Sequence, residues 1–207
     1  MPKVQTKKKN AAGDPYTCCQ CSDTIKAGES YYEWSFRYGG TYRQHTSHGT
    51  PKQSQLTQSK MSAAYAAIES AENSISIAEN IEDLRSALEE CAGEIDSVAY
   101  EYQESFDAIP ENLQQGGPAQ EMQEKIKALQ SFSNELQDTA SNLEEFDEDE
   151  PEEPDKPGPD DAPDPDLTKA REEWEEEHSQ WEDRASEYLD EQRSQAEEVL
   201  SNLSIML

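Results

Sequence analysis

The sequence predicts a mainly α fold in which a small β-hairpin module precedes a helical hairpin and a C-terminal helix. Apolar residues recur every three to four positions over residues 79–146 and 167–203, a period typical of amphipathic helices. Alternating aromatic residues around a Gly-Gly pair predict two short strands near the N-terminus. Residues 144–166 are acidic and proline-rich, which indicates a break between the helical parts.

Charge divides the chain into two unequal parts. The formal net charge is -29 over 207 residues. Residues 1–60 hold nine Lys and Arg against four Asp and Glu, and residues 61–207 hold eight against 42, so their net charges are +5 and -34. A basic start can meet nucleic acid, whereas the acidic remainder would repel it. Only 33% of the residues are apolar, so one large core is not expected.

Two closely spaced pairs of potential metal ligands lie in the basic part. Cys18 and Cys21 form a C-x2-C pair, and His45 and His48 form an H-x2-H pair after 23 intervening residues. Two thiolates and two imidazoles suit a tetrahedral Zn2+, and four protein ligands indicate a structural ion. Cys19 could replace Cys18, and the spacing leaves that choice open.

The segment between the two pairs predicts the hairpin that separates them. Tyr32, Trp34 and Phe36 alternate along the sequence, which places them on one face of a strand. Gly39 and Gly40 can take the positive φ angles of a two-residue hairpin turn. The return strand then brings the histidines back toward the cysteines.

The order of knuckle, hairpin, second ligand pair and helix resembles the treble-clef class of zinc folds. Residues 16–50 are also similar to the zinc finger of poly(ADP-ribose) polymerases, which has a C-x2-C pair, an aromatic-rich hairpin and an H-x2-C pair. His48 stands at the fourth position here, and the spacer is shorter. The resemblance implies a zinc-stapled, treble-clef-like module.

A second resemblance covers more of the chain. The stretch from Cys18 to Phe36, continued by Arg-Tyr-Gly-Gly at 37–40 and Ser-Gln-Leu-Thr-Gln-Ser-Lys at 54–60, looks like small proteins of tailed bacteriophages. Those proteins share an N-terminal zinc knuckle and an acidic helical remainder, and the resemblance implies no particular activity. Crowded, unpaired cysteines favour a metal site in a reducing compartment, so we expect a cytoplasmic protein, in the host cytoplasm if it is viral.

The acidic part predicts several helices. One helix is expected from about Ser54 to Glu72. Residues 79–109 carry a coiled-coil-like heptad, in which Cys91 is a small buried core residue, and residues 119–146 repeat the pattern after a loop. These two helices should fold back on each other as an antiparallel hairpin. The heptad positions are Ile81, Leu84, Leu88, Cys91, Ile95, Val98, Tyr102, Ser105 and Ile109.

The last helix carries a candidate partner face. Trp174, Trp181 and Tyr188 fall seven residues apart. We expect this stripe to dock in cis on the hairpin, and the alternative is that it binds another chain as a helix in a groove. The acidic segment before it is expected to be a solvated linker, with a mimic of nucleic-acid phosphate or a docking tail as the alternative.

The expected organisation has five parts, which are a disordered basic arm (1–14), a zinc-binding β-hairpin module (15–52), a helical bundle or hairpin (53–146), a disordered acidic Pro-rich linker (147–166) and an amphipathic C-terminal helix (167–207). No run of about 18 apolar residues is present, so no membrane span is expected.

These features favour a non-enzymatic protein–protein adaptor or assembly factor, whose helices bind a protein partner or a second copy. The sequence has no G-x-S-x-G, P-loop or G-x-G-x-x-G motif, so an enzyme is not expected. The alternative is a weak nucleic-acid-binding or regulatory protein that uses residues 1–60. Its candidate contacts are Lys7, Lys8, Lys9, Lys26, Arg37, Arg43 and Lys52.

Overall fold

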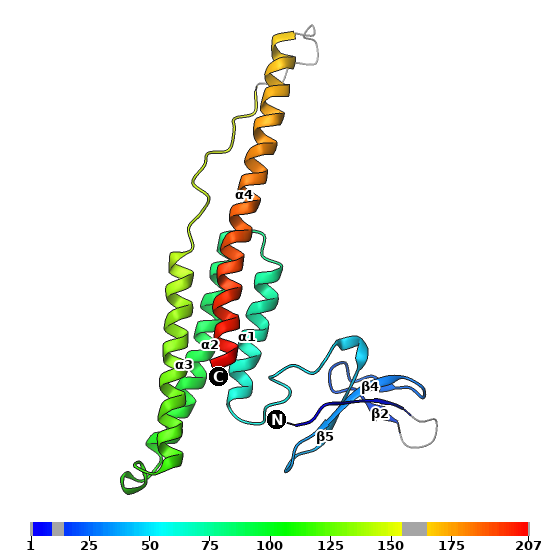
Figure 1. Cartoon of the computed structure of the whole chain (residues 1–207), viewed down its shortest axis with the longest axis vertical. Helices are drawn as coiled ribbons and strands as arrows, with labels where there is room; N and C mark the ends of the chain where they lie inside the picture. Colours follow the sequence, from blue (N-terminus) through cyan, green and yellow to red (C-terminus); the bar gives the residue numbers. More distant parts are fainter. Residues whose placement is uncertain (1, 10–14, 155–164, 207) are drawn as a thin grey trace.

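The protein is mainly α, with a small β module beside one end of an elongated helical bundle (Figure 1). A computed structural model describes residues 2–9, 15–154 and 165–206. Within this part of the chain, no helix is both long and apolar enough to cross a membrane. The helices and the small N-terminal β module confirm the predicted mainly α fold class.

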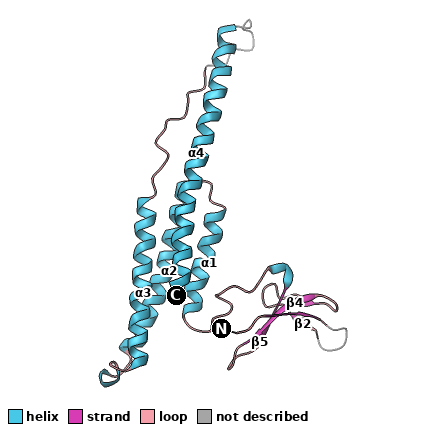
Figure 2. Ribbon diagram, viewed as in Figure 1, coloured by secondary structure: helices cyan, strands magenta, loops and turns pink. Residues whose placement is uncertain are grey.

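In its described residues, the β module contains two small antiparallel sheets, drawn as magenta strands in Figure 2. The first has the strand order β1-β4-β5, and the second pairs β2 with β3. The strands are β1 (Gln5–Lys8), β2 (Tyr16–Thr17), β3 (Thr24–Ile25), β4 (Ser30–Ser35) and β5 (Thr41–His45).

Strand β1 corrects one expectation. Residues 1–14 were expected to form a disordered arm, but residues 5–8 pair with β4, with Lys7 opposite Tyr31. Strand β5 covers one edge of β4, and the other edge offers unpaired N–H and C=O groups that an extended segment can satisfy. Composition alone hides this pairing, because the strand is polar. Residues 10–14 lie outside the described residues.

The β4–β5 hairpin is present, but its turn differs from the expected one. The N–H of Gly39 donates to the carbonyl of Phe36, so Arg37 and Tyr38 form the centre of the turn. The expectation that Gly39 and Gly40 supply positive φ angles is wrong, since neither has a positive φ. Gly39 instead allows a close approach, because a Cβ there would lie 2.4 Å from Nε2 of Gln58.

Among the described residues, four α-helices follow the β module. They are α1 (Met61–Ser76), α2 (Ile81–Asp107), α3 (Gly117–Asn142) and α4 (Pro165–Met206), and a short 3-10 helix, η2 (Glu111–Leu113), lies in the loop before α3. The first helix begins later than the expected Ser54. Ser54 donates to the Glu69 carboxylate through its N–H and its hydroxyl group, at 2.9 and 2.5 Å. Polar side chains in this segment therefore hold turns in place of a helix.

The core lies between α2 and its neighbours. The predicted heptad residues Leu84, Leu88 and Ile95 are completely buried. Ala92 and Ala99 are buried as well, because α2 packs against α1, α3 and α4 and not against a single partner. Small residues at these positions let the helices approach closely. The expectation of a helical hairpin completed by further apolar faces agrees with this packing.

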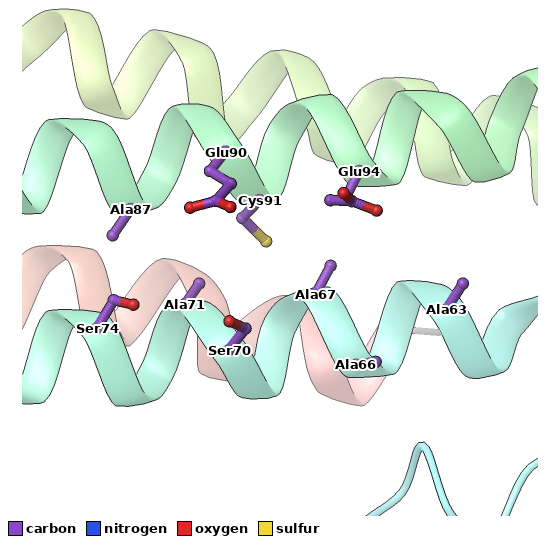
Figure 3. Close-up of a pocket in the computed structure, with 10 residues that line it drawn as sticks. All are labelled: Ala63, Ala66, Ala67, Ser70, Ala71, Ser74, Ala87, Glu90, Cys91 and Glu94. Atoms are coloured by element: carbon purple, nitrogen blue, oxygen red, sulfur yellow. The ribbon is translucent and has the colours of Figure 1, made fainter.

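Cys91 lies at the contact between α1 and α2. Figure 3 shows it projecting toward α1, in a shallow groove that Ala67, Ala71 and Ala87 also line. Only 2% of Cys91 is exposed, and burial raises the pKa of its thiol to about 12. This cysteine is therefore a packed core residue, as expected from its heptad position.

Helix α4 completes the core at its C-terminal end. Ala196 and Leu200 are fully buried in the bundle, and Arg193 donates to the carbonyl of Ala78 at 2.9 Å. Of the stripe that was expected to dock on the hairpin, Tyr188 packs against this core, whereas the indole groups of Trp174 and Trp181 donate to the carbonyls of Pro151 and Glu148. The N-terminal half extends beyond the other helices, as the orange part of α4 in Figure 1 shows.

Candidate metal centre

The four predicted ligands come together on one side of the β module. The ligand atoms of Cys18, Cys21, His45 and His48 all lie within 4.8 Å of one another. In the described part of the chain, this is the one group of three or more Cys, His and acidic residues close enough to share a metal ion. The cluster is made from segments 24 residues apart in sequence, so it depends on the fold.

A tight turn presents the two cysteines. The N–H of Cys18 donates to the carbonyl of Asp23 at 2.8 Å, and the N–H of Ser22 donates to the carbonyl of Cys18 at 3.0 Å. Ser22 has a φ of 63°, a left-handed conformation that lets the chain reverse within a few residues. Gly28, with a φ of 87°, closes a separate turn before β4.

The surroundings of the Cys18 thiol favour its ionised, thiolate form. Its burial disfavours the charged form, but backbone N–H groups of Cys21, His45 and Gln20 donate hydrogen bonds to the sulfur. The hydrogen bonds outweigh burial and lower the pKa of Cys18 from 9.0 to about 6. A thiolate is the form of cysteine that binds metals.

The choice between Cys18 and Cys19 is decided by the fold. Cys18 is buried in the cluster, whereas Cys19 is exposed and lies outside it. The N–H of Cys19 donates to the carbonyl of Arg43 at 2.8 Å, which joins the cysteine turn to β5.

Strand β5 and the 3-10 helix η1 (Thr46–His48) supply the histidines. The Nδ1 atom of His45 lies 3.6 Å from Sγ of Cys21, and its Nε2 atom lies 3.6 Å from a carboxylate oxygen of Glu29. A further hydrogen bond fixes the turn that carries His48, since Nε2 of the buried Gln44 donates to the carbonyl of Gly49 at 2.8 Å.

This donor set fits a tetrahedral ion. Bond lengths of about 2.0–2.3 Å place the ligands of a tetrahedral Zn2+ about 3.3–3.8 Å apart. The atoms of the cluster need to move inward by only about an ångström to reach that spacing. Two sulfur and two nitrogen donors also match the ligand preference of such ions better than that of Mg2+ or Ca2+.

The predicted nucleic-acid contacts do not form one free basic patch. Lys7 and Arg43 both pair with Glu33, and Lys9 is buried with its ammonium group 4.4 Å from the centre of the Tyr16 ring. These three cations therefore act within the module. The remaining candidates are exposed and are Lys8, Lys26, Arg37 and Lys52.

The predicted partner face on α4 is half-buried. Residues 146–153, called the strap below, lie against Trp174, Trp181 and Tyr188. The expectation of a disordered linker from residue 147 is wrong for this segment, because it makes specific contacts with α4. Residues 155–164 of the predicted linker lie outside the described residues.

Sequence reasoning missed two supporting residues, Glu29 and Gln44. A signal for Glu29 was available, since a metal-binding histidine usually donates its second ring N–H to a carboxylate. Glu29 is one of only four acidic residues among residues 1–60. The sequence carried no such signal for Gln44, because its role is a hydrogen bond to the carbonyl of Gly49, which the turn after β5 brings within reach.

Comparisons with protein-family models, curated proteins and solved structures found no match to this chain. Its class is therefore defined by its own fold and site. The chain is a mainly α protein with an N-terminal β module and a Cys/His cluster that could hold a metal ion.

Proposed function

We propose that this chain is a non-enzymatic protein–protein adaptor or assembly factor whose β module is held together by one structural Zn2+. Four protein ligands leave no coordination position for a reacting water, which favours a structural ion over a catalytic one. The ion would connect the cysteine turn to the end of β5, two segments joined otherwise by few hydrogen bonds.

The projecting half of α4 is the observation that carries the adaptor proposal. The helix has 42 residues, about 63 Å of length, while α2 and α3 have 27 and 26. Its N-terminal turns extend beyond the bundle and carry the half-buried side chains of Trp174 and Trp181, which the strap contacts. A helix of this kind is typical of proteins that bind other chains.

The resemblance to tailed-bacteriophage proteins supports a viral origin with the host cytoplasm as the compartment. Free cysteines throughout the described residues are compatible with a reducing environment. Under this proposal the partner is a protein of the same compartment, or a second copy of the chain.

Affinity capture from the native cell tests the function. Deleting residues 167–207 would also remove the core residues Ala196 and Leu200, so substitutions on the projecting half of α4 are more specific. The full chain should retain a stoichiometric protein partner or itself, and Trp174→Ala with Trp181→Ala should lose it. A full chain that retains no protein and stays monomeric at every concentration would contradict the proposal.

A nucleic-acid-binding function is the second candidate, supported by the tip of the β4–β5 hairpin. Tyr38 is 89% exposed there, and the Arg37 guanidinium lies 5.2 Å from the centre of its ring. Exposed aromatic rings beside cations can stack on bases. Binding of single-stranded DNA that weakens with salt and with Tyr38→Ala would favour this function, and absence of binding at low salt would exclude it.

A further inference from the structure

The strap runs antiparallel to the projecting half of α4. Its residues contact the helix in reverse order, from Tyr188 back to Arg171. The contacts are Phe146 with Trp181 and Tyr188, Glu148 with Arg184 and Trp181, Glu150 with His178, Pro151 with Trp174, and Glu153 with Arg171. An ordered series of this kind fixes one register between the two segments.

The spacing of the two tryptophans matches the repeat of an extended chain. The indole N–H groups of Trp174 and Trp181 donate to the backbone carbonyls of Pro151 and Glu148, each at 3.0 Å. Seven helical residues rise by about 10.5 Å, and three extended residues span about 9–10 Å. The two donors therefore meet carbonyls three residues apart, which requires an extended backbone and not a helix.

The helix face also selects acidic side chains. Arg184 pairs with Glu148 at 2.8 Å, His178 lies 3.1 Å from Glu150, and Arg171 lies 3.7 Å from Glu153. Helix α4 is otherwise rich in Glu and Asp, so the two arginines on this face are distinctive. At the end of the strap, the Phe146 ring lies 5.9 Å from the Trp181 ring and 5.7 Å from the Tyr188 ring.

We infer that this face of α4 is a binding site for an extended acidic segment with an aromatic anchor, and that the strap of a second copy of the chain can occupy it. The inference rests on the adaptor function proposed above and names the occupant. A second copy carries the same eight residues and can make the same contacts. Reciprocal exchange of the two straps gives a closed, symmetric dimer, in which each α4 holds the strap of its partner.

The position of the site permits this exchange. The contact of Phe146 with Tyr188 lies at the bundle, because Tyr188 packs against its core. The contacts nearer the N-terminus of α4 lie on the half of the helix that extends beyond the bundle (Figure 1), and a second chain can reach these without entering the core. The chain's own strap competes for the site at a high effective concentration, because both are parts of one molecule. Exchange is therefore favoured where copies are concentrated, as in an assembly.

Complementation between two full-length variants tests the exchange. Phe146→Ala with Glu148→Gln weakens the strap and keeps the helix face. Trp174→Ala with Trp181→Ala weakens the face and keeps the strap. In a mixture, the intact strap of the second variant should bind the intact face of the first, and sedimentation velocity should detect a heterodimer that neither variant forms alone.

Glu152→Gln supplies the matched control. Glu152 is exposed and has no ion pair among the described residues. This variant keeps its own strap on the face, so the face-deficient variant should bind it about tenfold or more weakly than it binds the strap-deficient variant. Equal binding to both, or no complex with either at the highest soluble concentration, would overturn the inference.

The indole hydrogen bonds give a second measurement. Trp181→Phe, placed in the strap-deficient variant, keeps an aromatic ring and removes one N–H donor. Binding of the intact strap should fall, whereas unchanged binding would place the contact elsewhere and overturn the inference. If the straps do not exchange but the full chain still retains another protein from the cell, the strap exchange is wrong and the adaptor function is still supported.

Discussion

The Nε2 atom of His45 lies 3.6 Å from a carboxylate oxygen of Glu29, on the side of the ring away from the cysteines. The N–H of Lys26 donates to the same carboxylate at 2.7 Å and fixes its position. The ring can therefore offer Nδ1 to a metal ion and donate its Nε2–H to Glu29. With a metal ion at Nδ1, the Glu29 carboxylate would orient the His45 ring and raise its basicity.

Replacing this carboxylate should weaken metal binding without unfolding the helices. For Glu29→Gln we expect a loss of about tenfold or more in zinc affinity. Removing the hydrogen-bond partner of a metal-binding histidine usually has an effect of this size. Competition with a chromophoric chelator measures the affinity. Glu72→Gln, an exposed change on α1, is the control and should leave it unchanged.

The purified chain should contain one zinc ion. Cys21→Ala should lose it, because the substitution removes a ligand of the cluster, while Cys19→Ala should keep a full equivalent. Elemental analysis of the three proteins measures the content. A Cys19→Ala protein without zinc, or a Cys21→Ala protein with a full equivalent, would show that the ligand assignment is wrong.

The bundle core should be sensitive to cavities in α2. Leu88 and Ile95 are completely buried, so Leu88→Ala or Ile95→Ala should lower the free energy of unfolding by about 2–5 kcal/mol. Urea unfolding followed by circular dichroism measures the change. Tyr100→Ala, on the same helix at a 66% exposed position, should cost much less, and an equal cost would contradict this account of the core.

Cys91 should make the bundle less stable in alkali. Burial first, and then the neighbouring Glu94, Glu72 and Glu90, raise the pKa of its thiol in the folded protein from 9.0 to about 12. Between these values the unfolded chain releases the proton that the folded protein keeps, so the free energy of unfolding falls as pH rises.

A single group of this kind contributes roughly 1 kcal/mol per pH unit between about pH 9 and pH 11. The unfolding free energy of the unaltered chain should therefore decline more steeply with pH than that of Cys91→Ala. The comparison of slopes removes the contributions of tyrosines and lysines, which both proteins share. Parallel slopes would show that the thiol ionises as readily in the folded bundle as in the unfolded chain.

Much of the fold could be predicted because its signals are local. The heptad of α2 depends on a period that any amphipathic helix shows, and Leu84, Leu88 and Ile95 are buried where it placed them. The limits of α1 were harder to predict. Ser54 donates to the carboxylate of Glu69, a residue of α1 that lies 15 positions later, and a helical period does not reveal a contact of this kind.

Strand β1 and the β4–β5 turn were also hard to predict from the sequence. The polar residues of β1 carry no apolar alternation, so their pairing with β4 depends on an open edge that appears in the folded sheet. Gly39 was correctly singled out but for the wrong reason. What distinguishes the position is the close approach of the Gln58 side chain, from a residue 19 positions later, and not a positive φ.

By itself, the sequence determined the helical class, the heptad core and the set of Cys and His residues that the cluster contains, because periodicity and ligand spacing are properties of neighbouring residues. The tertiary structure decided that Cys18 and not Cys19 joins the cluster, that Glu29 supports His45, and that the strap covers the tryptophans of α4. Each of these depends on groups far apart in the chain, whose distances are set only when the β module, the bundle and the strap have packed.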